Sequence, residues 1–525
     1  MSSRRQFLQE VTAGMALAAA HAADTAGVFE VKSMGAAGDG KTLDTPAIDK
    51  AIAAASAAGG GTVHFPPGDY LCYTIHLKSN VVLYLDQGAK IVAADSPAVG
   101  DSNTKAYDLA EPNEWDKFQD YGHSHWRNSL IWGEGVENVS ILGPGLIWGK
   151  GLSRGSGRDG PRAEQAGVGN KTIALKNCHN VTLRDFSILH GGHFGILATG
   201  ADNFTIDNLK IDTNRDGIDI DCCRNVRVSN CMVNSPWDDG ICPKSSYALG
   251  YPKPTEYVTI ANCYVTGAYE EGTMLDGTYK KWTPETRMSR TGRIKFGTES
   301  NGGFRNITVA NCVFDGCQGF ALESVDGALL EDIAITNISM RDIVNMPIFL
   351  RLGSRMRGPA GGPGGTPVGT LRRVLISNIV CSNAASRAAS ILSGIPGHRI
   401  EDVRLSDIFI EHRGGGTAAD AALQPAEMEN GYPEPTMFGA TPSHGLYIRH
   451  VNGLEVSNLE IVAEAADARP AFVLDDVRDS DFSRIRTPAN AAAGTFVLKR
   501  VEDFTLRDCK TAPDTRVEKA DERKI

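Results

Sequence analysis

A short unit that recurs about once every 22 residues constrains the fold of this chain more than any other feature. Each copy begins with one residue, usually Asn or Asp, that precedes alternating apolar and polar residues. Copies begin at Asn180, Asn203, Asn225, Tyr257, Asn306, Asp332 and Asp402. The closest copies are separated by 203 − 180 = 23 and 225 − 203 = 22 residues. This length suits one coil of three short strands and three turns, so the sequence predicts an all-β solenoid of stacked parallel strands.

A solenoid accounts for the length of the chain without several globular domains. Each added coil extends the same core, so 525 residues are compatible with one continuous unit. We assign that unit to residues 23–510 and a charged C-terminal tail to residues 511–525. A short helix is expected to cover the apolar N-terminal end, beginning at Asp44 or Thr45 with Pro46 in its first turn.

Residues 1–22 have the pattern of a signal peptide for twin-arginine export. The pattern is Ser3-Arg4-Arg5-Gln6-Phe7-Leu8, followed by an apolar run to Ala20 and an A-x-A cleavage site at Ala20-His21-Ala22. No other run approaches the roughly 20 apolar residues that a membrane-spanning helix needs. We therefore expect a mature protein that is periplasmic or secreted and has no membrane segment.

Charge and cysteine spacing argue against two classes of partner. The formal charge is −10, and no long Lys/Arg cluster interleaved with aromatic residues occurs outside the leader, so nucleic acid is not an expected partner. The eleven cysteines include Cys178, Cys231, Cys263 and Cys312, which all follow an Asn at the same place in the repeat. We expect these four to stack as small buried side chains. No C-x-x-C pairs or H-x-x-x-H spacing support a zinc site.

Larger gaps between copies of the repeat indicate loops inserted between coils, as in 306 − 257 = 49 residues. Three long inserts stand out, at about 268–290, 353–369 and 414–443. We interpret them as rims of a cleft, because function concentrates in such loops. For the Gly/Pro-rich 353–369 insert a disordered surface loop is an equal alternative.

Acidic residues bunch on two adjacent coils, in Asn214-Arg-Asp216-Gly-Ile-Asp219 and in Trp237-Asp238-Asp239-Gly-Ile-Cys-Pro-Lys244. Asp216 and Asp238 are 238 − 216 = 22 residues apart, which equals one coil. Parallel strands stack at roughly 4.8 Å, so this spacing places Asp216, Asp238 and Asp239 in one patch. Carboxylates that close cannot all ionise freely, and at least one should have a raised pKa. Hydrolysis of a glycosidic bond needs one protonated and one ionised carboxyl group. The alternative is that these residues only form turns, as Asp219 is expected to do.

The two motifs, N-x-D-G-I-D and D-D-G-I-C-x-K-S one coil later, resemble the signature of glycoside hydrolase family 28, the polygalacturonases and rhamnogalacturonases. The resemblance implies a right-handed parallel β-helix, an inverting mechanism, and neither cofactor nor metal. It implies that Asp238 is the general acid, that Asp216 and Asp239 hold and activate water, and that Asn214 orients the cluster.

The chain departs from the family pattern at the segments that bind the substrate. Family polygalacturonases carry a Gly-His-Gly segment and, one coil later, an Arg-Ile-Lys segment. Here Thr291–Ser300 has no histidine, Arg293-Ile294-Lys295 lies one coil early, and Glu323 stands where a lysine is expected. The subsites for sugar units should therefore differ from those of the family.

Several side chains near the acids are candidates for sugar binding. Lys244, Arg293 and Lys295 can bind a uronate carboxylate, although they could equally be solvated charges at the edge of the cleft. His193, one coil before Asp216, can contact the sugar or serve a structural role. Glu299 and Glu323 can bind hydroxyl groups of a partly neutral sugar.

Together these observations predict an inverting, exo-acting glycoside hydrolase that cleaves α-glycosidic bonds in plant pectic poly- or oligosaccharides containing galacturonate or rhamnogalacturonan. A β-helix polysaccharide lyase would instead need an acidic calcium cage beside a lone basic residue. A non-catalytic carbohydrate-binding solenoid would not need three clustered acids.

Overall fold

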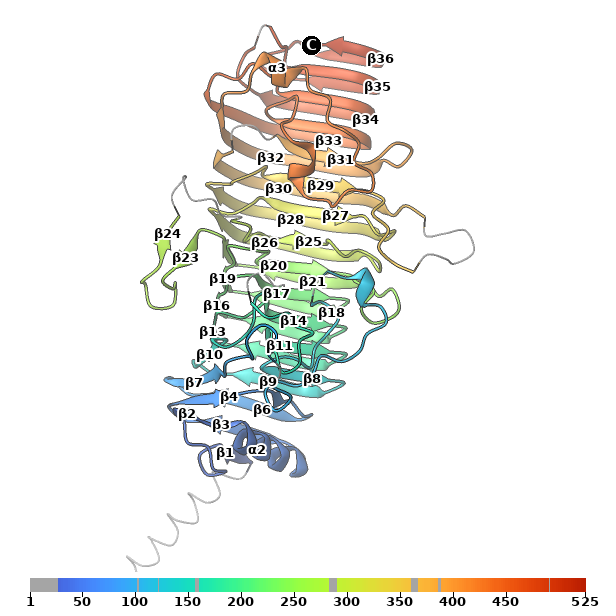
Figure 1. Cartoon of the computed structure of the whole chain (residues 1–525). Coiled ribbons are helices and arrows are strands. Elements are labelled where there is room, and N and C mark those ends of the chain that lie inside the picture. The colour runs from blue at the N-terminus through green and yellow to red at the C-terminus, as the bar shows by residue number, and fades with distance from the viewer. Residues whose placement is uncertain are drawn as a thin grey trace, which may run out of the picture.

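The computed structural model describes residues 27–101, 103–120, 122–155, 160–282, 290–359, 367–385, 389–490 and 492–525. Within these ranges most regular structure is β-strand, and parallel strands stack along the length of the molecule (Figure 1). The fold is a right-handed parallel β-helix, as the repeat and the family resemblance predict. The expected signal peptide lies outside the described residues. Among the helices that are described, none has the length and apolar character to cross a membrane.

The first face of the β-helix consists of parallel strands that pair from coil to coil. It contains β1 (Val28–Glu30), β3 (Gly61–Phe65), β6 (Val81–Leu85), β9 (Glu137–Leu142), β12 (His179–Arg184), β15 (Asp202–Asp207), β18 (Arg224–Ser229) and β21 (Thr255–Ala261). The second face contains β2 (Asp39–Leu43), β4 (Gly68–Cys72), β7 (Ala89–Ala93), β10 (Leu146–Trp148), β13 (Ser187–Leu189), β16 (Lys210–Asp212), β19 (Met232–Asn234) and β22 (Tyr264–Thr266).

The third face carries the predicted acids. It contains β5 (Ile75–His76), β8 (Ile131–Glu134), β11 (Lys171–Lys176), β14 (Phe194–Thr199), β17 (Asp216–Asp221), β20 (Ile241–Lys244), β25 (Lys295–Phe296), β27 (Phe320–Ser324), β29 (Ile348–Leu352) and β31 (Ser390–Ser393). In the later coils longer strands bend from one face to the next. These are β26 (Phe304–Asp315), β28 (Leu329–Arg341), β30 (Thr370–Ala384), β32 (Ile400–Gly414), β33 (Leu446–Ala465), β34 (Phe472–Arg486) and β35 (Phe496–Arg507).

The repeated Asn explains why each coil turns at the same place. Asn180, Asn203 and Asn225 adopt left-handed backbone conformations, with φ of 54°, 53° and 55°. Asn and Asp tolerate this region better than other residues with a side chain. The amide of Asn203 also donates to Oδ1 of Asn180 over 3.0 Å, and that of Asn180 donates to Oδ1 of Asn138 over 2.7 Å. The same residue type therefore turns the chain and ties each coil to the one before it.

The cysteines of the repeat are buried, as predicted: Cys178, Cys231, Cys263 and Cys312 are at most 2% exposed. All eleven cysteines lie within the described residues, and all are free thiols. They act as small side chains that fill the core of successive coils.

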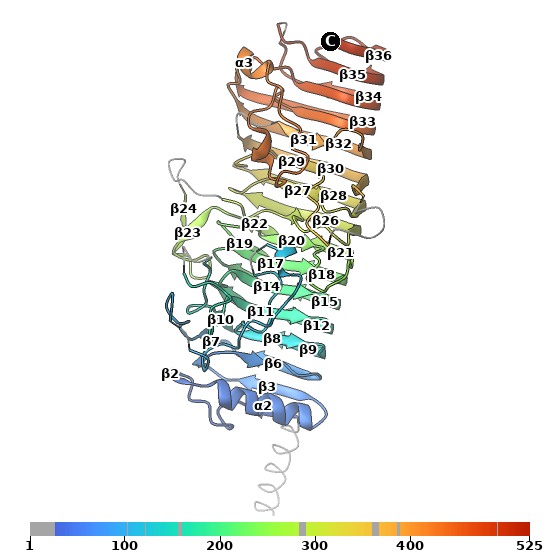
Figure 2. The same ribbon diagram turned by 45° about the vertical axis from the view of Figure 1, so that its right-hand side comes forward.

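Helix α2 (Thr45–Ala57) covers the N-terminal end of the core, as predicted (Figure 2). Its face of Ile48, Ala51, Ile52 and Ala55 is buried. Asp44 occupies the position before the helix, but its carboxylate accepts hydrogen bonds from the backbone N–H groups of Ala37 and Gly38 over 2.6 and 3.0 Å. Asp44 thus fixes the preceding loop rather than capping the helix with its side chain.

The C-terminal end differs from the tail that the sequence predicts over residues 511–525. Thr515–Lys524 forms β36, which pairs antiparallel with β35 (Figure 1). Val517 is buried against the last coil, and Lys519 forms an ion pair with Glu502 over 3.1 Å. An uncovered last coil would expose unpaired backbone groups, and a short charged strand both pairs with it and discourages further pairing.

The inserts carry the remaining short elements. The 268–290 insert contains an antiparallel hairpin of β23 (Tyr269–Glu271) and β24 (Lys280–Lys281). The 414–443 insert contains α3 (Ala418–Ala421), which lies near the C-terminal end of the solenoid in Figure 1, and a 3-10 helix at Pro435–Phe438. A further connection, residues 94–130 between β7 and β8, contains a 3-10 helix at Asp116–Phe118.

Candidate active site

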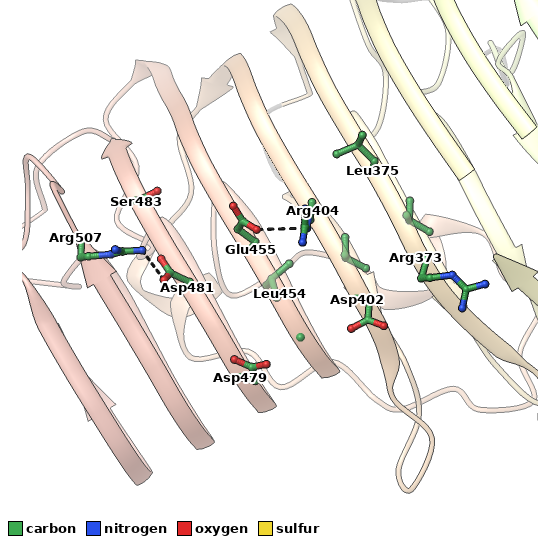
Figure 3. A pocket seen from close by; sticks show the side chains of 13 residues that line it. Arg373, Leu375, Asp402, Arg404, Leu454, Glu455, Asp479, Asp481, Ser483 and Arg507 are labelled. Carbon is green, nitrogen blue, oxygen red and sulfur yellow. Dashed lines mark hydrogen bonds and ion pairs between the residues drawn. The ribbon is translucent and has the colours of Figure 1, made fainter. Parts of the chain in front are cut away.

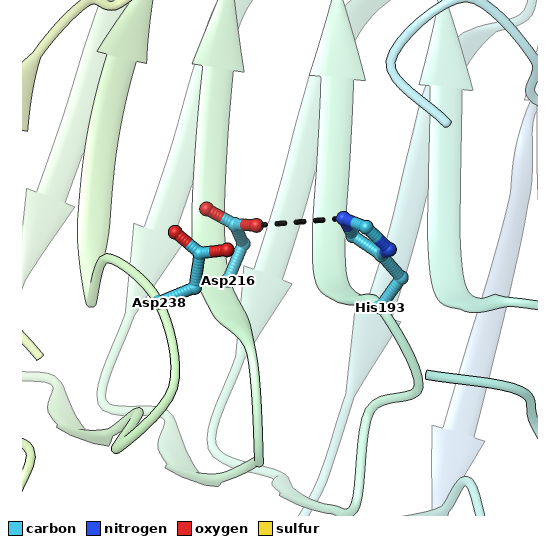
Figure 4. A group of neighbouring side chains, drawn as sticks. All are labelled: His193, Asp216 and Asp238. Atoms are coloured by element: carbon cyan, nitrogen blue, oxygen red, sulfur yellow. Dashed lines mark ion pairs between the residues drawn. The ribbon is translucent and has the colours of Figure 1, made fainter. Parts of the chain in front are cut away.

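The predicted acids meet at the N-terminal ends of neighbouring strands on the third face. Asp216 is the first residue of β17, and Asp238 and Asp239 lie in the turn that leads into β20. The N–H of Gly217 donates to the carbonyl of Asp239 over 3.0 Å, so the two acidic segments lie on adjacent coils. One oxygen each of Asp216 and Asp238 and one ring nitrogen of His193 lie within 4.8 Å of one another (Figure 4). The one-coil spacing thus brings the acids together, as predicted.

The three carboxyl groups differ in electrostatic environment. Burial, reinforced by the charges of Asp238 and Asp219, raises the pKa of Asp216 well above its ordinary value. Burial also raises the pKa of Asp238, against the opposing charge of Arg215, whose Nη2 donates to Asp238 Oδ2 over 2.8 Å. For Asp239 burial is outweighed by Lys295 and Arg293, so its pKa is lowered. The surroundings therefore favour retention of a proton by the Asp216–Asp238 pair and favour the ionised form of Asp239.

His193 packs against the acid pair as a neutral ring. Its Nε2 lies 3.9 Å from Asp216 Oδ2, and the ring stacks on Phe194 with centroids 4.3 Å apart. Burial and the nearby charge of Arg215 hold the pKa of His193 well below its usual range. His193, Asp216 and Asp238 are also groups of the type that bind cations. A metal ion there would lie beside Arg215 and Lys244, which line the same cavity, so the surrounding charge opposes it.

Arg293 and Lys295 are buried and paired with protein carboxylates. Arg293 is 0% exposed; its Nε donates to Asp239 Oδ1 over 2.9 Å and its Nη2 to Glu434 Oε1 over 2.6 Å. Lys295 Nζ lies 3.2 Å from Glu434 Oε1, 3.5 Å from Asp239 Oδ2 and 3.7 Å from Glu323 Oε2. These two cations are therefore not solvated edge charges, the alternative left open by the sequence.

Lys244 belongs to a second buried group of charges. Its Nζ lies 3.6 Å from Glu299 Oε2 and 3.8 Å from Asp219 Oδ2. Although burial opposes it, the neighbouring acids hold the pKa of Lys244 well above its usual range, so the ammonium stays charged. The other oxygen of Glu299 accepts a hydrogen bond from the N–H of Asp120 over 3.0 Å. Glu299 is thus bound within the protein rather than presented to a sugar hydroxyl.

Glu323 is a fully buried acid whose pKa is raised. It is 0% exposed, and neither carboxyl oxygen has a hydrogen-bond partner among the described residues. Burial raises the pKa of Glu323 to about 8, although Lys295 acts in the opposite direction. At neutral pH this side chain is therefore mostly protonated.

Three segments far apart in the sequence meet beside the acids from outside the coils. Asp120, from the 94–130 connection, accepts a hydrogen bond from the hydroxyl of Tyr432 over 3.3 Å and pairs with Arg357. Tyr432 belongs to the 414–443 insert and also accepts a hydrogen bond from Thr298 Oγ1 over 2.9 Å. Lys295 Nζ lies 5.6 Å from the centre of its ring. These contacts join three inserts above one point of the third face.

The acids, the cations and these covering residues enclose a cavity of about 250 Å³. It is lined by Asp120, His123, His193, Arg215, Asp216, Asp238, Asp239, Lys244, Lys295 and Tyr432. Within this lining Asp238 is partly open to solvent, with a side chain 29% exposed, whereas that of Asp216 is 3% exposed. Asp216 and Asp238 thus line the same small cavity, Asp216 at a buried position and Asp238 at a partly exposed one.

Two family profiles match the chain. The profile described as "Glycosyl hydrolases family 28" matches residues 113–268, which include all three predicted catalytic acids. Over these residues the chain is similar to glycosyl hydrolase family 28. The profile described as "Rhamnogalacturonase A/epimerase, pectate lyase-like" matches residues 28–142, at the N-terminal end of the solenoid.

Two curated proteins are similar to about two fifths of this chain. A probable polygalacturonase of Vitis vinifera is 25% identical over 239 residues, 43% of this chain and 46% of the relative. An exo-poly-alpha-D-galacturonosidase of Dickeya chrysanthemi is 26% identical over 262 residues, 41% of each protein. The aligned part thus spans less than half the length of these relatives. A solved exopolygalacturonase from Thermotoga maritima has the same fold, with a TM-score of 0.56, 19% identity, and coverage of 83% of this chain and 91% of that chain.

A second hollow adjoins the acidic segment that carries Asn214, on the side of the earlier coils. This groove has a volume of about 680 Å³, and its lining includes Lys150, Arg154, His190, Asn214 and Glu270. Asn214 therefore faces this groove, and no hydrogen bond from its side chain to the acids is found in the described residues; its expected orienting role stays a prediction. Glu270 accepts a hydrogen bond from Trp237 Nε1 over 2.9 Å and brings the 268–290 insert to the rim.

A third hollow, of about 780 Å³, lies on the outer surface of the C-terminal coils, on β30, β32, β33, β34 and β35 (Figure 3). Its charged side chains form exposed pairs, such as Arg404 with Glu455 at 3.4 Å and Arg507 with Asp481 at 2.6 Å. None of the acid cluster lines it. Despite its size, this hollow lacks the buried, perturbed groups that mark the site on the third face.

Reasoning from the sequence missed several residues of the site: Asp120, His123, Arg215, Tyr432 and Glu434. Arg215 lies inside the first acidic motif and could have been included from its position alone. His123 Nε2 lies 3.3 Å from Asp219 Oδ2. The histidines that precede Trp126 in the 94–130 connection could have indicated this residue from the sequence. The 414–443 insert was predicted as a rim, but no local pattern marks Tyr432 or Glu434 within it.

Proposed function

We propose that this protein is an inverting glycoside hydrolase that cleaves α-glycosidic bonds in pectic poly- or oligosaccharides from a chain end. The observation that carries the proposal is the Asp216–Asp238 pair, with raised pKa values, beside an ionised Asp239. Two carboxyl groups in opposite protonation states are what glycoside hydrolysis requires.

Asp238 is suited to act as the general acid. The two coupled carboxyl groups titrate as a pair, so one proton is retained when the other group ionises. Asp238 is the more exposed of the two and can reach a glycosidic oxygen in the cavity. It would donate its proton to that oxygen as the bond to the anomeric carbon breaks. Arg215 favours ionised Asp238 and would stabilise the carboxylate left after the transfer.

Asp216 and Asp239 are suited to hold the attacking water. Asp239 stays ionised because Arg293 and Lys295 face it, and it can accept the proton that water loses as it attacks the anomeric carbon. His193 is neutral and packed, so it can position Asp216 or a sugar hydroxyl without adding charge. The nearest oxygens of Asp216 and Asp238 are closer than the carboxyl separation usual for inverting enzymes, so stereochemistry needs its own measurement.

Exo action is supported by the contacts that close the cavity toward the later coils. Tyr432, Asp120 and Arg357 meet there, from the 414–443 insert, the 94–130 connection and the 353–369 insert. A long polysaccharide could not continue through this closed end. Only the terminal unit or units of a chain would then fit beside the acids.

The experiment is product analysis on pectic polysaccharides and oligosaccharides with wild type and Asp238→Asn. We expect new reducing ends without the ultraviolet absorbance of unsaturated uronates, and short products from the start of the reaction. Proton NMR of the fresh product should show the inverted anomer. The variant should lose about a thousandfold in kcat. Unsaturated products would indicate a lyase, a retained anomer would refute inversion, and binding without any product would indicate a carbohydrate-binding solenoid.

We also propose export to the periplasm or the medium through the leader at residues 1–22. The twin-arginine pattern supports this, and replacing Arg4 and Arg5 by Lys should leave the protein in the cytoplasmic fraction. Unchanged fractionation of that variant would contradict the proposal.

A further inference from the structure

We propose that the sugar unit beside Lys295 carries no carboxylate, because Glu434 of the 414–443 insert already occupies the carboxylate position shared by Lys295 and the buried Arg293. The scissile bond would then have a neutral sugar on this side and its uronate on the other. This inference rests on the proposed function and specifies its substrate.

The geometry at Glu434 is that of a bound carboxylate. Its Oε1 is shared by Arg293 Nη2 at 2.6 Å and Lys295 Nζ at 3.2 Å. A guanidinium and an ammonium converging on one carboxylate oxygen are how proteins bind an acidic ligand. Here the ligand is a side chain of the same protein. Lys295, to which Glu434 is bound, lines the cavity together with Tyr432, so Glu434 neutralises a cation of the cavity wall from behind it.

Both cations already face carboxylates of the protein. Arg293 also pairs with Asp239, and Lys295 lies near both Asp239 and Glu323. On the same wall Lys244 is paired with Glu299 and Asp219. A uronate placed here would displace Glu434 or stand next to it and to ionised Asp239. Like charges placed together disfavour binding strongly in a partly dry site.

The 414–443 insert is held firmly, so Glu434 is not a loosely attached side chain. Arg449 donates to the carbonyls of Pro425 and Ala426 over 2.9 and 2.7 Å, and Arg351 donates to that of Met428 over 2.9 Å. Phe438 is 5% exposed and packs under both guanidinium groups, at 5.3 Å from Arg351 and 4.9 Å from Arg449. The insert is thus anchored on both sides of Glu434.

The test compares two oligosaccharides of similar length: trigalacturonate, in which every unit is charged, and an oligosaccharide of alternating galacturonate and rhamnose. Wild type should cleave the mixed oligosaccharide with a kcat/KM at least about tenfold higher than that for trigalacturonate. Glu434→Gln keeps the shape and removes the charge. It should shift the ratio toward trigalacturonate by at least about tenfold. Glu434→Ala should shift it in the same direction.

Glu429→Gln is the matched control, because this exposed glutamate lies on the same insert and loses the same charge. It should leave the ratio unchanged, and thermal unfolding should show that all variants are folded. A wild type that cleaves trigalacturonate as well as the mixed oligosaccharide would overturn the inference. So would a Glu434→Gln ratio equal to that of wild type.

Binding separates this inference from the proposed function. Calorimetry of both oligosaccharides with Asp238→Asn, alone and combined with Glu434→Gln, does not depend on turnover. If wild type hydrolyses neither sugar, the proposed hydrolysis fails, yet a preference for the mixed oligosaccharide that Glu434→Gln abolishes would still support a neutral sugar at this place. Equal binding of both sugars to both proteins, or no binding, would overturn the inference.

Discussion

The groove and the cavity on the two sides of the acids are built in different ways. The groove, lined by Lys150, Arg154 and Asn214, is formed largely by the turns of successive coils and the connections beside them, and it leaves Lys150 and Arg154 exposed. The cavity is covered by inserts, and its cations are buried against protein carboxylates. Within one fold, the side toward the earlier coils thus offers accessible positive charge, and the side toward the later coils offers charge that is already neutralised.

This difference suggests a way in which a solenoid can vary what it binds while the coils that carry the acids stay the same. The acids come from two adjacent repeats, whereas the covering residue Tyr432 contacts Asp120 across 312 positions of sequence. Inserts can vary while the coils that carry the acids stay the same. The expected consequence is that mutations on the two sides act on different properties, stability on the cavity side and substrate affinity on the groove side.

The largest difference should appear when an arginine is removed from each side. Arg293→Met leaves Asp239 and Glu434 without a main partner, and removing one member of a buried ion pair costs about 3–5 kcal/mol of unfolding free energy. Arg154→Met, at an exposed position, should change it by less than about 0.5 kcal/mol and should instead weaken binding of uronate oligosaccharides. Urea unfolding and calorimetry measure the two effects. Equal losses of stability would remove the contrast between the two sides.

Glu323 should make the cavity side sensitive to pH. Its pKa is raised from 4.5 to about 8 in the folded protein, so between these values the folded state binds more protons than the unfolded state. Stability should therefore fall as pH rises through this window, by up to about 1.4 kcal/mol per pH unit. Glu323→Gln cannot titrate and should flatten the curve. Urea unfolding of wild type and Glu323→Gln at pH 5, about 6.5 and about 8 measures the free energy of unfolding. The same dependence on pH in both proteins would contradict the raised pKa of Glu323.

Tyr432→Ala should open the closed end of the cavity. The variant loses the hydrogen bonds with Thr298 and Asp120 and the ring beside Lys295, at an expected cost of about 1–2 kcal/mol in unfolding free energy. If this contact blocks the cleft, longer oligosaccharides should appear among the first products. Chromatography of early products measures the change. An unaltered product pattern would mean that Tyr432 does not set the end of the site.

The smallest effect is expected at the hollow on the C-terminal coils. Arg404 and Glu455 are 71% and 54% exposed, so Arg404→Ala should alter unfolding free energy by less than about 0.5 kcal/mol and leave hydrolysis unchanged. A loss of activity in this variant would show that the hollow in Figure 3 takes part in function.

Much of the catalytic cluster could be predicted because it follows the repeat. Asp216 and Asp238 are one coil apart in sequence, and a residue one coil away in a solenoid lies directly above its partner. The same rule placed His193 beside Asp216. It could not assign Arg293 and Lys295 their shared partner, since Glu434 comes from a segment without the period.

The sequence by itself determined the β-helix, the capping helix, the buried cysteines and the meeting of the three acids, because a period along the chain becomes a stack in space. Only the tertiary structure decided that Tyr432 lines the cavity beside the acids and that Glu434 neutralises Arg293 and Lys295. The 414–443 insert is held in this position by its Phe438, which packs against Arg351 and Arg449. Those contacts depend on which coils lie beside the insert after folding. The sequence of the insert contains no local pattern from which its neighbours could be predicted.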